Sequence, residues 1–200
     1  MHLNQNHTGQ RPPVAAFGIC GSFCTLESIL PVMRTLRGQG WDILPVMSGP
    51  AGSLDTRFGT ASFWRRSVEQ ITGHPVLDSL TGVEPLGPRG LADVMIAAPC
   101  TGTTLARLDL GLSDTPVTLA AKSLLRIHKP VVVAVSTNDG LGASAPHIAA
   151  LLNRKDFYFV PFGQDDPVHK PSSLKADLTR LPETLQLAMQ GRQIQPVLAL

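Results

Sequence analysis

The chain has 200 residues, of which 43% are hydrophobic and 16% are charged, and its formal net charge is +2. This length and composition fit one globular domain and exclude a disordered or low-complexity chain. Basic residues are scattered, and no apolar run approaches the roughly 20 residues of a membrane helix, so we expect no nucleic-acid or membrane partner. Three cysteines without metal-ligand spacing, and no apolar leader, predict a reduced, cytoplasmic location without a metal site.

Short apolar segments alternate with longer amphipathic ones after a polar start. We expect residues 1–13 to form a disordered tail and residues 14–200 to form the domain. Strands are predicted over residues 14–20, 41–47, 94–98, 131–135 and 157–162. Helices are predicted over residues 25–37, 58–72, 104–112, 116–127, 143–153 and 174–189. Residues 73–90 are expected to form a turn-rich connection.

Proline refines these predictions at three positions. Pro31 falls inside the first helical pattern and should kink that helix or delay its start. Pro45 indicates an edge or strand-end position for the second strand. Pro116 fits the first turn of a helix that Asp114 or Thr115 would cap.

The alternation of strands and helices predicts the fold class. Continuously apolar strands separated by helices are typical of a mainly parallel sheet covered on both faces. We therefore predict a single three-layer α/β domain of the Rossmann-like, flavodoxin-like type. In this architecture ligands bind outside the carboxyl ends of the strands.

Small hydroxyl residues and glycines follow four of the predicted strands. The segments are Gly21-Ser22, Ser48-Gly49, Thr101-Gly102-Thr103-Thr104 and Ser136-Thr137-Asn138. Hydroxyl donors, unpaired backbone N–H groups and little side-chain bulk suit a phosphate group. Each segment on its own is better explained as a helix cap or turn. Their recurrence at successive strand ends favours a ligand site.

The loop sequences narrow the choice of ligand. The chain has no Gly-Lys-Ser/Thr ending of a P-loop. It lacks the G-x-G-x-x-G fingerprint after the first strand, and no acidic residue ends the second strand to hold an adenosine ribose. A mononucleotide with one terminal phosphate therefore fits better than NAD.

Several longer motifs resemble a known family. The segment PCTGTTLA at residues 99–106 resembles the signature of the flavoprotein superfamily that contains cysteine decarboxylases and flavin prenyltransferase. Within that superfamily, three stretches resemble the family of dipicolinate synthase B subunits. They are SDTPVTLAAKSLLR, HKPVVVAVSTNDGLG and VPFGQDDPVHKPSSL.

The resemblance implies a function, a cofactor and partners. It implies an FMN-dependent oxidoreductase subunit that helps to form pyridine-2,6-dicarboxylate, from a dihydro- or hydroxytetrahydrodipicolinate, during bacterial sporulation. It implies a nicotinamide-binding A subunit as partner and a homo-oligomer, either a trimer or a multiple of trimers, with FMN at a subunit interface. It assigns the cofactor site to Gly21, Ser22, Phe23, Ser48, Thr101, Gly102, Thr103, Thr104, Ser136 and Thr137.

A small dicarboxylate substrate would need cationic and polar partners. Arg57, Lys122 and Lys170 are candidates, and each is otherwise explained as a surface cation or a structural ion pair. Asn138 follows the fourth strand and is expected either to contact substrate or, with Asp139, to cap the next helix. No residue is singled out as a catalytic acid or base.

Three residue patterns bear on alternative functions. The decarboxylase branch has a Pro-x-Met-Asn motif where this chain reads Val135-Ser136-Thr137-Asn138, which disfavours decarboxylation. His74 could approach a flavin, although a Gly-His-Pro turn explains it better. Cys100 is expected to pack beside the cofactor rather than to act as a nucleophile. The alternatives are a decarboxylase or prenyltransferase and a non-catalytic, flavin-bearing scaffold for the A subunit.

Overall fold

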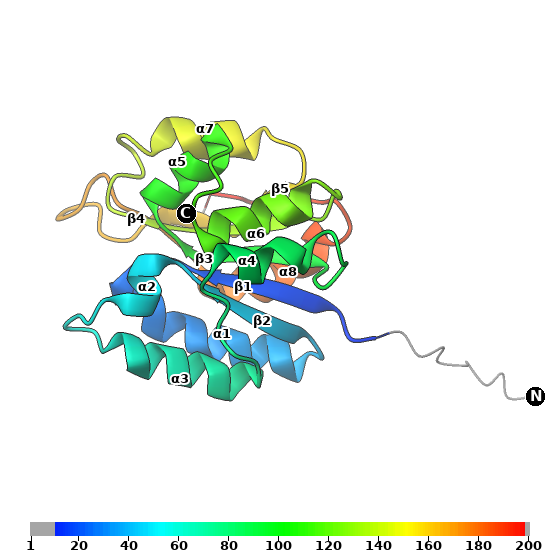
Figure 1. Ribbon diagram of the computed structural model, residues 1–200. Helices are drawn as coiled ribbons and strands as arrows, with labels where there is room; N and C mark the ends of the chain where they lie inside the picture. Colours follow the sequence, from blue (N-terminus) through cyan, green and yellow to red (C-terminus); the bar gives the residue numbers. More distant parts are fainter. Residues whose placement is uncertain (1–10, 199–200) are drawn as a thin grey trace, which may run out of the picture.

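A computed structural model describes residues 11–198 and shows one mainly parallel sheet between two layers of helices (Figure 1). In the described part of the chain the sheet has seven strands in the order β2-β1-β3-β4-β7-β6, and β5 also pairs with β4. The strands are β1 (Val14–Ile19), β2 (Asp42–Met47), β3 (Val94–Cys100), β4 (Val131–Thr137), β5 (Phe157–Phe159), β6 (Phe162–Gln164) and β7 (Leu174–Ala176).

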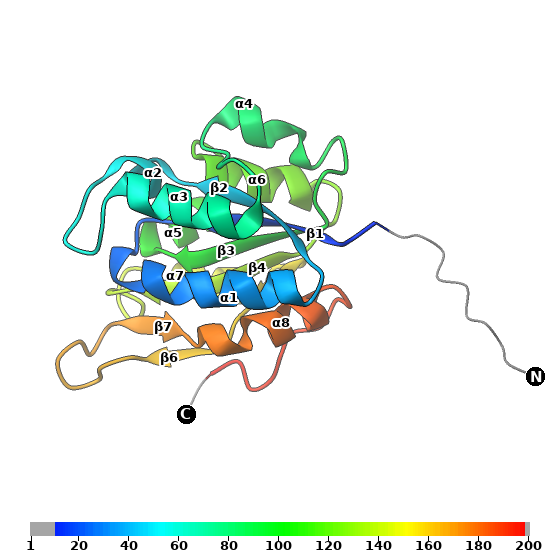
Figure 2. The ribbon, with the colours of Figure 1, turned by 90° about the horizontal axis from the view of Figure 1, so that it is seen from below.

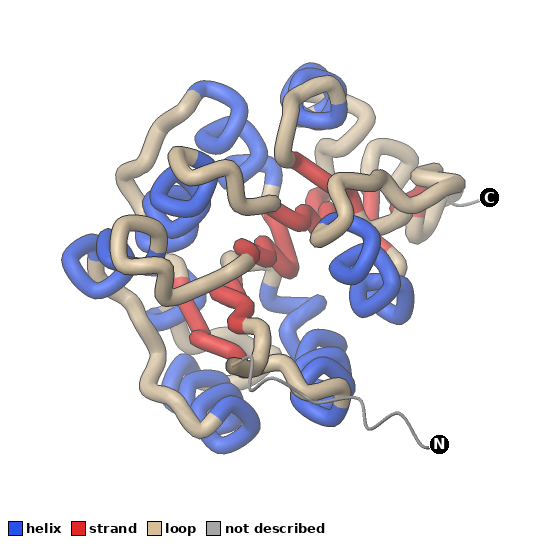
Figure 3. The backbone as a smooth tube through the Cα atoms, turned by 90° about the vertical axis from the view of Figure 1, so that its right-hand side faces the viewer, coloured by secondary structure: helices blue, strands red, loops and turns tan. Residues whose placement is uncertain are grey.

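Helices cover both faces of the sheet. They are α1 (Leu26–Gly38), α2 (Gly49–Ser53), α3 (Ala61–Thr72), α4 (Leu80–Val83), α5 (Gly102–Leu110), α6 (Pro116–Leu125), α7 (Ala145–Leu152) and α8 (Leu181–Ala188). Figure 1 shows α1 and α3 on one side of the sheet and α5, α6 and α7 on the other. Seen from the first side, α8 lies beside α1 (Figure 2). The view in Figure 3 shows the strands as a band with helices around it. The predicted three-layer α/β fold is confirmed.

The central strands explain why the sheet is buried on both faces. Every residue of β3 is buried, as are the first six residues of β4. β1, β2, β3, β4 and β5 pair in parallel, so the carboxyl ends of β1 to β4 lie on one edge of the domain. Continuous apolar strands of this kind need helices on both sides, which is the arrangement observed.

The structure confirms one of the predictions made from proline, contradicts another and decides between two candidate caps. β2 is an edge strand, as Pro45 indicated, and a parallel bridge between Val46 and Leu77 covers part of that edge. Pro31 does not delay its helix, because α1 begins at Leu26 and runs through it. Thr115, not Asp114, caps α6, and Thr115 and Thr118 form a reciprocal capping box.

The sequence-based prediction was wrong near the end of the chain. Residues 157–162 do not form one last strand but the two short strands β5 and β6. The predicted helix over residues 174–189 begins as strand β7, and only its second half is helical, as α8. β6 and β7 form an antiparallel hairpin, and β7 also pairs antiparallel with the end of β4. The hairpin carries residues 165–173 past the carboxyl end of β4.

Other element boundaries differ by a few residues. The helix predicted over residues 58–72 starts at Ala61, after the cap Thr60, and α5 starts two residues earlier than predicted. Helix α2 was not predicted, and the expected turn-rich connection contains the short helix α4.

Two further observations concern the N-terminal segment and the length of the helices. Residues 1–10 of the predicted tail lie outside the described residues. Its last residues are held against the domain, because Arg11 forms an ion pair with Asp93 at 2.9 Å and the Pro13 carbonyl accepts from the N–H of Asp42. Within residues 11–198, no helix has the length and apolar character needed to span a bilayer.

Candidate functional site

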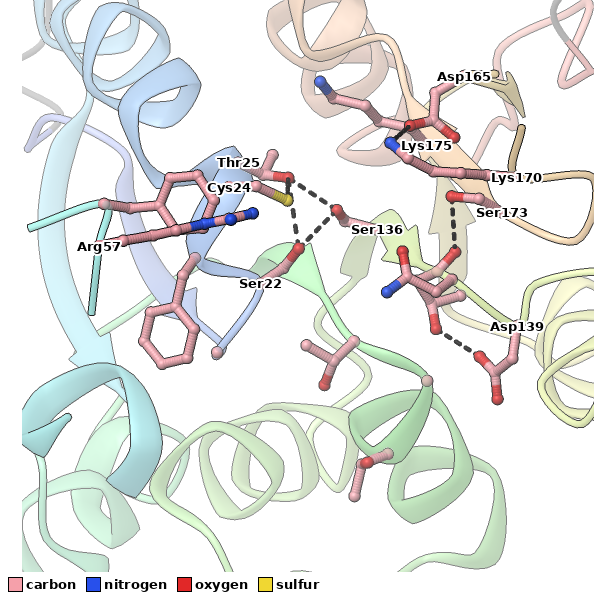
Figure 4. Close-up of a pocket in the computed structure, with 18 residues that line it drawn as sticks. Ser22, Cys24, Thr25, Arg57, Ser136, Asp139, Asp165, Lys170, Ser173 and Lys175 are labelled. Atoms are coloured by element: carbon pink, nitrogen blue, oxygen red, sulfur yellow. Dashed lines mark hydrogen bonds and ion pairs between the residues drawn. The ribbon is translucent and has the colours of Figure 1, made fainter. Parts of the chain in front are cut away.

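A cavity of about 730 Å³ lies at the carboxyl ends of β1, β3 and β4. This is the edge at which the fold class predicts a ligand, and the volume falls within the roughly 300–1,000 Å³ of small-molecule sites. Figure 4 shows side chains from distant parts of the chain facing one another across it. The predicted site residues that line it are Gly21, Ser22, Phe23, Arg57, Thr101, Gly102, Thr103, Ser136, Thr137 and Asn138.

The N-terminus of α5 forms one wall of the cavity. Thr101 is the helix cap, and its hydroxyl accepts a hydrogen bond from the N–H of Thr104 at 3.4 Å. The N–H groups of Gly102 and Thr103 belong to the first turn, where a helix offers them no acceptor. Together with the helix dipole, these donors suit an anionic oxygen.

Gly102 occupies a position that has no room for a side chain. A Cβ atom there would lie 2.8 Å from both Asp139 Oδ1 and Thr137 Oγ1, and it would be closer still to Ser144 Oγ. Glycine therefore lets the start of α5 approach the turn that follows β4. The glycine, the free N–H groups and the hydroxyls together fit a phosphorylated ligand.

Three hydroxyl groups meet at the base of the cavity (Figure 4). Ser136 Oγ lies 2.9 Å from Ser22 Oγ and 2.9 Å from Thr25 Oγ1, and the last two atoms are 3.3 Å apart. We call Ser22, Thr25 and Ser136 the hydroxyl cluster. It joins the loop after β1 to the end of β4, and each hydroxyl can donate or accept. Sequence reasoning missed Thr25, although it lies three residues after Ser22 in the same loop.

Asp139 provides negative charge next to the start of α5. The hydroxyl of Thr137 donates to its Oδ1 atom, and Ser144 Oγ donates to the same atom at 2.8 Å. These two hydrogen bonds, Thr137 first, lower the pKa of Asp139 below its usual value, so the carboxylate is charged at neutral pH. The expectation that Asp139 caps the next helix is only partly met, because Asp139 fixes the turn before α7 but Ser144 occupies the cap position.

Cationic side chains stand on two opposite walls of the cavity. Arg57 lies on the loop before α3, with its guanidinium 4.8 Å from the ring centre of Phe58. Lys170 and Lys175 lie on the β6–β7 hairpin, across the hydroxyl cluster from Arg57 (Figure 4). Sequence reasoning weighed Arg57 and Lys170 but missed Lys175, because nothing local in the sequence indicates the hairpin that carries it.

The hairpin wall also contains carboxylates. Lys170 Nζ lies 3.5 Å from Asp165 Oδ2. The nearby Ser173 hydroxyl, followed by the charge of Lys170, lowers the pKa of Asp165. Asp166 instead holds the turn itself, since its side chain accepts from the N–H of His169 at 3.0 Å.

Several candidate residues do not line the cavity. Ser48 is buried and caps α2 through the N–H of Ala51. Thr104 is buried, with its hydroxyl 3.0 Å from that of Thr101. Lys122 lines a separate cavity of about 460 Å³ and donates to Ser113 at 3.3 Å, so the structure does not bring it to the other candidates. His74 binds the Asp42 carboxylate at 3.0 Å, at the start of β2 and far from the strand ends.

The cysteines differ in exposure. Cys20 and Cys100 are buried, and Cys24 is exposed and lines the cavity. Burial raises the pKa of Cys20 to about 11, and it raises the pKa of Cys100 well above its usual value. Both are therefore thiols at neutral pH, which agrees with packing beside the cavity rather than with a thiolate nucleophile.

No cluster of three or more His, Cys, Asp or Glu side chains within residues 11–198 is arranged to hold a metal ion.

The sequence model of the Flavoprotein family matches residues 4–155. This range includes the carboxyl ends of β1, β3 and β4 and the start of α5, which together build most of the cavity. The chain therefore belongs to the flavoprotein family.

Relatives place the chain more narrowly within that family. The dipicolinate synthase B subunit of Bacillus subtilis (strain 168) is 40% identical over 182 residues, which cover 91% of each protein. The crystal structure of the dipicolinate synthase B subunit from Bacillus halodurans C is 42% identical and superimposes with a TM-score of 0.86, covering 94% of this chain and 96% of that one. Within the flavoprotein family, the chain is thus a member of the dipicolinate synthase B-subunit group.

A more distant structure shows the same fold. The FMN-dependent cysteine decarboxylase SpaF is 21% identical, with a TM-score of 0.67 over 89% of this chain and 97% of that one. The three-layer architecture is therefore common to proteins whose sequences have diverged widely.

Proposed function

We propose that this chain is the FMN-binding B subunit of a dipicolinate synthase and contributes to forming pyridine-2,6-dicarboxylate during sporulation. The observation that carries the proposal is the cavity at the strand ends, in a chain 40% identical to such a B subunit over 91% of its length. A phosphate site at α5 and cationic side chains on the outer walls suit a phosphorylated cofactor beside an anionic substrate.

The residues of the cavity indicate how FMN would be held. The N–H groups of Gly102 and Thr103, with the hydroxyl of Thr101, form the donor set for its phosphate. The hydroxyl cluster, Gly21 and Phe23 would contact the rest of the cofactor. Bound flavin supplies a two-electron acceptor, which is the chemistry needed to convert a dihydropyridine dicarboxylate into an aromatic one.

The same proposal includes partners. A nicotinamide-binding A subunit would work with this chain, and trimers or multiples of trimers would complete the site at an interface between copies. Support comes from the open side of the cavity, where Cys24, Arg57, Phe58 and Asn138 are exposed in the single chain. We place the complex in the cytoplasm, in keeping with the three free cysteines of the described residues.

The first experiment is a visible absorption spectrum of the protein purified without added cofactor. We expect a flavin spectrum, release of FMN rather than FAD by mass spectrometry, and bleaching when the protein meets a dihydropyridine dicarboxylate without oxygen. Colourless protein that also fails to take up added FMN would refute the proposal. Turnover of a cysteinyl peptide or a prenyl phosphate would instead favour the decarboxylase or prenyltransferase alternative. Full dipicolinate synthesis by a complex of the A subunit with a flavin-free variant of this chain would favour the scaffold.

A further inference from the structure

Three cationic side chains line the cavity, and their surroundings differ. Lys170 is paired with Asp165, and Arg57 lies against the Phe58 ring. Within residues 11–198, Lys175 has no carboxylate within ion-pair distance. Lys175 and Arg57 are therefore the two cations of this cavity that no carboxylate of the described residues pairs with.

The register of the sheet directs Lys175 toward the hydroxyl cluster. Lys175 is paired with Ser136 across the antiparallel β4–β7 ladder. Directly opposed residues of antiparallel strands project from the same face, with Cβ atoms about 4.5–5.5 Å apart. Ser136 belongs to the hydroxyl cluster at the base of the cavity, so Lys175 projects on the cavity side as well.

The other neighbour of Lys175 leaves it uncovered. On β6 the residue opposite Lys175 is Gly163, which has no side chain to cover the lysine. The preceding residue on β7, Leu174, is buried and packs against Gly140. A Cβ atom added to Gly140 would lie 2.5 Å from the Cγ atom of Leu174. Leu174 thus anchors the strand while Lys175 remains accessible.

On the basis of the proposed function, we propose that Lys175 binds a carboxylate of the small dicarboxylate substrate. The Lys175 side chain stands on the opposite side of the hydroxyl cluster from Arg57 (Figure 4). The phosphate of the cofactor and the carboxylate of the substrate would then use different donors of one cavity.

The test compares two ligands on three variants of the full-length, FMN-loaded protein. Calorimetry measures the affinity for pyridine-2,6-dicarboxylate and for pyridine-2,6-dicarboxamide, which has the same shape without the charges. The variants are Lys175→Met, Lys175→Arg and, as a matched loss of one charge, Lys155→Met. Lys155 is exposed and lines the separate cavity. FMN affinity is measured on each variant by fluorescence titration.

We expect Lys175→Met to weaken binding of the dicarboxylate roughly tenfold, the size of one charge-assisted hydrogen bond, and to leave the diamide unchanged. Lys175→Arg should restore most of the loss, and Lys155→Met should change neither ligand. Equal dicarboxylate affinity in wild type and Lys175→Met, or no dicarboxylate binding to wild type, overturns the proposal. Loss of FMN affinity in Lys175→Met also overturns it, because the lysine would then serve the cofactor. Wild-type protein that takes up no FMN refutes the proposed function instead, and the ligand comparison on that flavin-free protein still decides the role of Lys175.

Discussion

Replacing Gly102 by alanine tests the close approach between α5 and the turn after β4. The new Cβ would lie 2.8 Å from Asp139 Oδ1 and Thr137 Oγ1, closer than carbon and oxygen atoms can pack. Overpacking of this kind costs about 1–3 kcal/mol, and the better helix propensity of alanine returns up to about 1 kcal/mol. We therefore expect the free energy of unfolding to fall by about 1–2 kcal/mol, or roughly 2–8 °C in Tm for a chain of this size.

The same substitution should have a larger effect on the cofactor. Shifting the start of α5 misdirects the N–H groups proposed to hold the phosphate, so we expect at least roughly a tenfold loss of FMN affinity, the value of one such charge-assisted bond. Thermal unfolding and fluorescence titration measure the two effects. The control is Gly142→Ala, whose Cβ would meet the Asp139 carbonyl oxygen at an ordinary 3.5 Å. Wild-type Tm and FMN affinity in Gly102→Ala, or equal losses in both variants, would show that the approach is not needed.

Three further predictions concern single side chains. Ser136→Ala removes the shared member of the hydroxyl cluster and should weaken FMN binding about fivefold, the value of one neutral hydrogen bond, in a fluorescence titration. The lowered pKa of Asp139 stabilises the fold above the unfolded value of 3.8, and this contribution is lost as the pH falls through the folded value. The Tm advantage of wild type over Asp139→Asn should therefore shrink below about pH 4, and a constant difference down to about pH 2 would contradict this. Iodoacetamide at about pH 8 should leave Cys20 and Cys100 unmodified in the folded protein, as mass spectrometry would show, because both thiols are buried and burial raises the pKa of each.

The parts of the fold that the sequence predicted are those encoded by local patterns. The strands at the centre of the sheet are runs of apolar residues between glycines and prolines, and this pattern is visible without tertiary information. The strand-end segments could also be located, because parallel strands bring their carboxyl ends to one edge. Ser22, Thr101 and Ser136 were therefore predicted to share one ligand site. In the structure all three line one cavity, although they are far apart in the chain.

The parts that the sequence could not predict depend on long-range pairing. β6 and β7 are three residues each, too short for an alternating pattern to distinguish them from loop or helix. The apolar spacing of residues 174–189 fits a helix, yet pairing with β4 and β6 makes Leu174–Ala176 extended. Lys122 was chosen for its charge alone, and its position on α6 directs it to another cavity. Lys175 could not be found, because only the register of β7 brings it to the site.

The end of β4 connects the two proposed binding functions of the cavity. Ser136 contributes its hydroxyl to the cluster that joins β4 to the loop after β1. Its strand partner is Lys175, and the adjacent pair, Thr137 and Leu174, fixes the same register. A shift of this ladder by one residue would turn Lys175 to the opposite face and move it away from the hydroxyl cluster. The position of Lys175, the lysine proposed to bind the substrate, relative to the proposed flavin site is therefore set by two residue pairs of a short ladder. This is the reason to expect that changes in β7 alter substrate binding while the fold and the cofactor site persist.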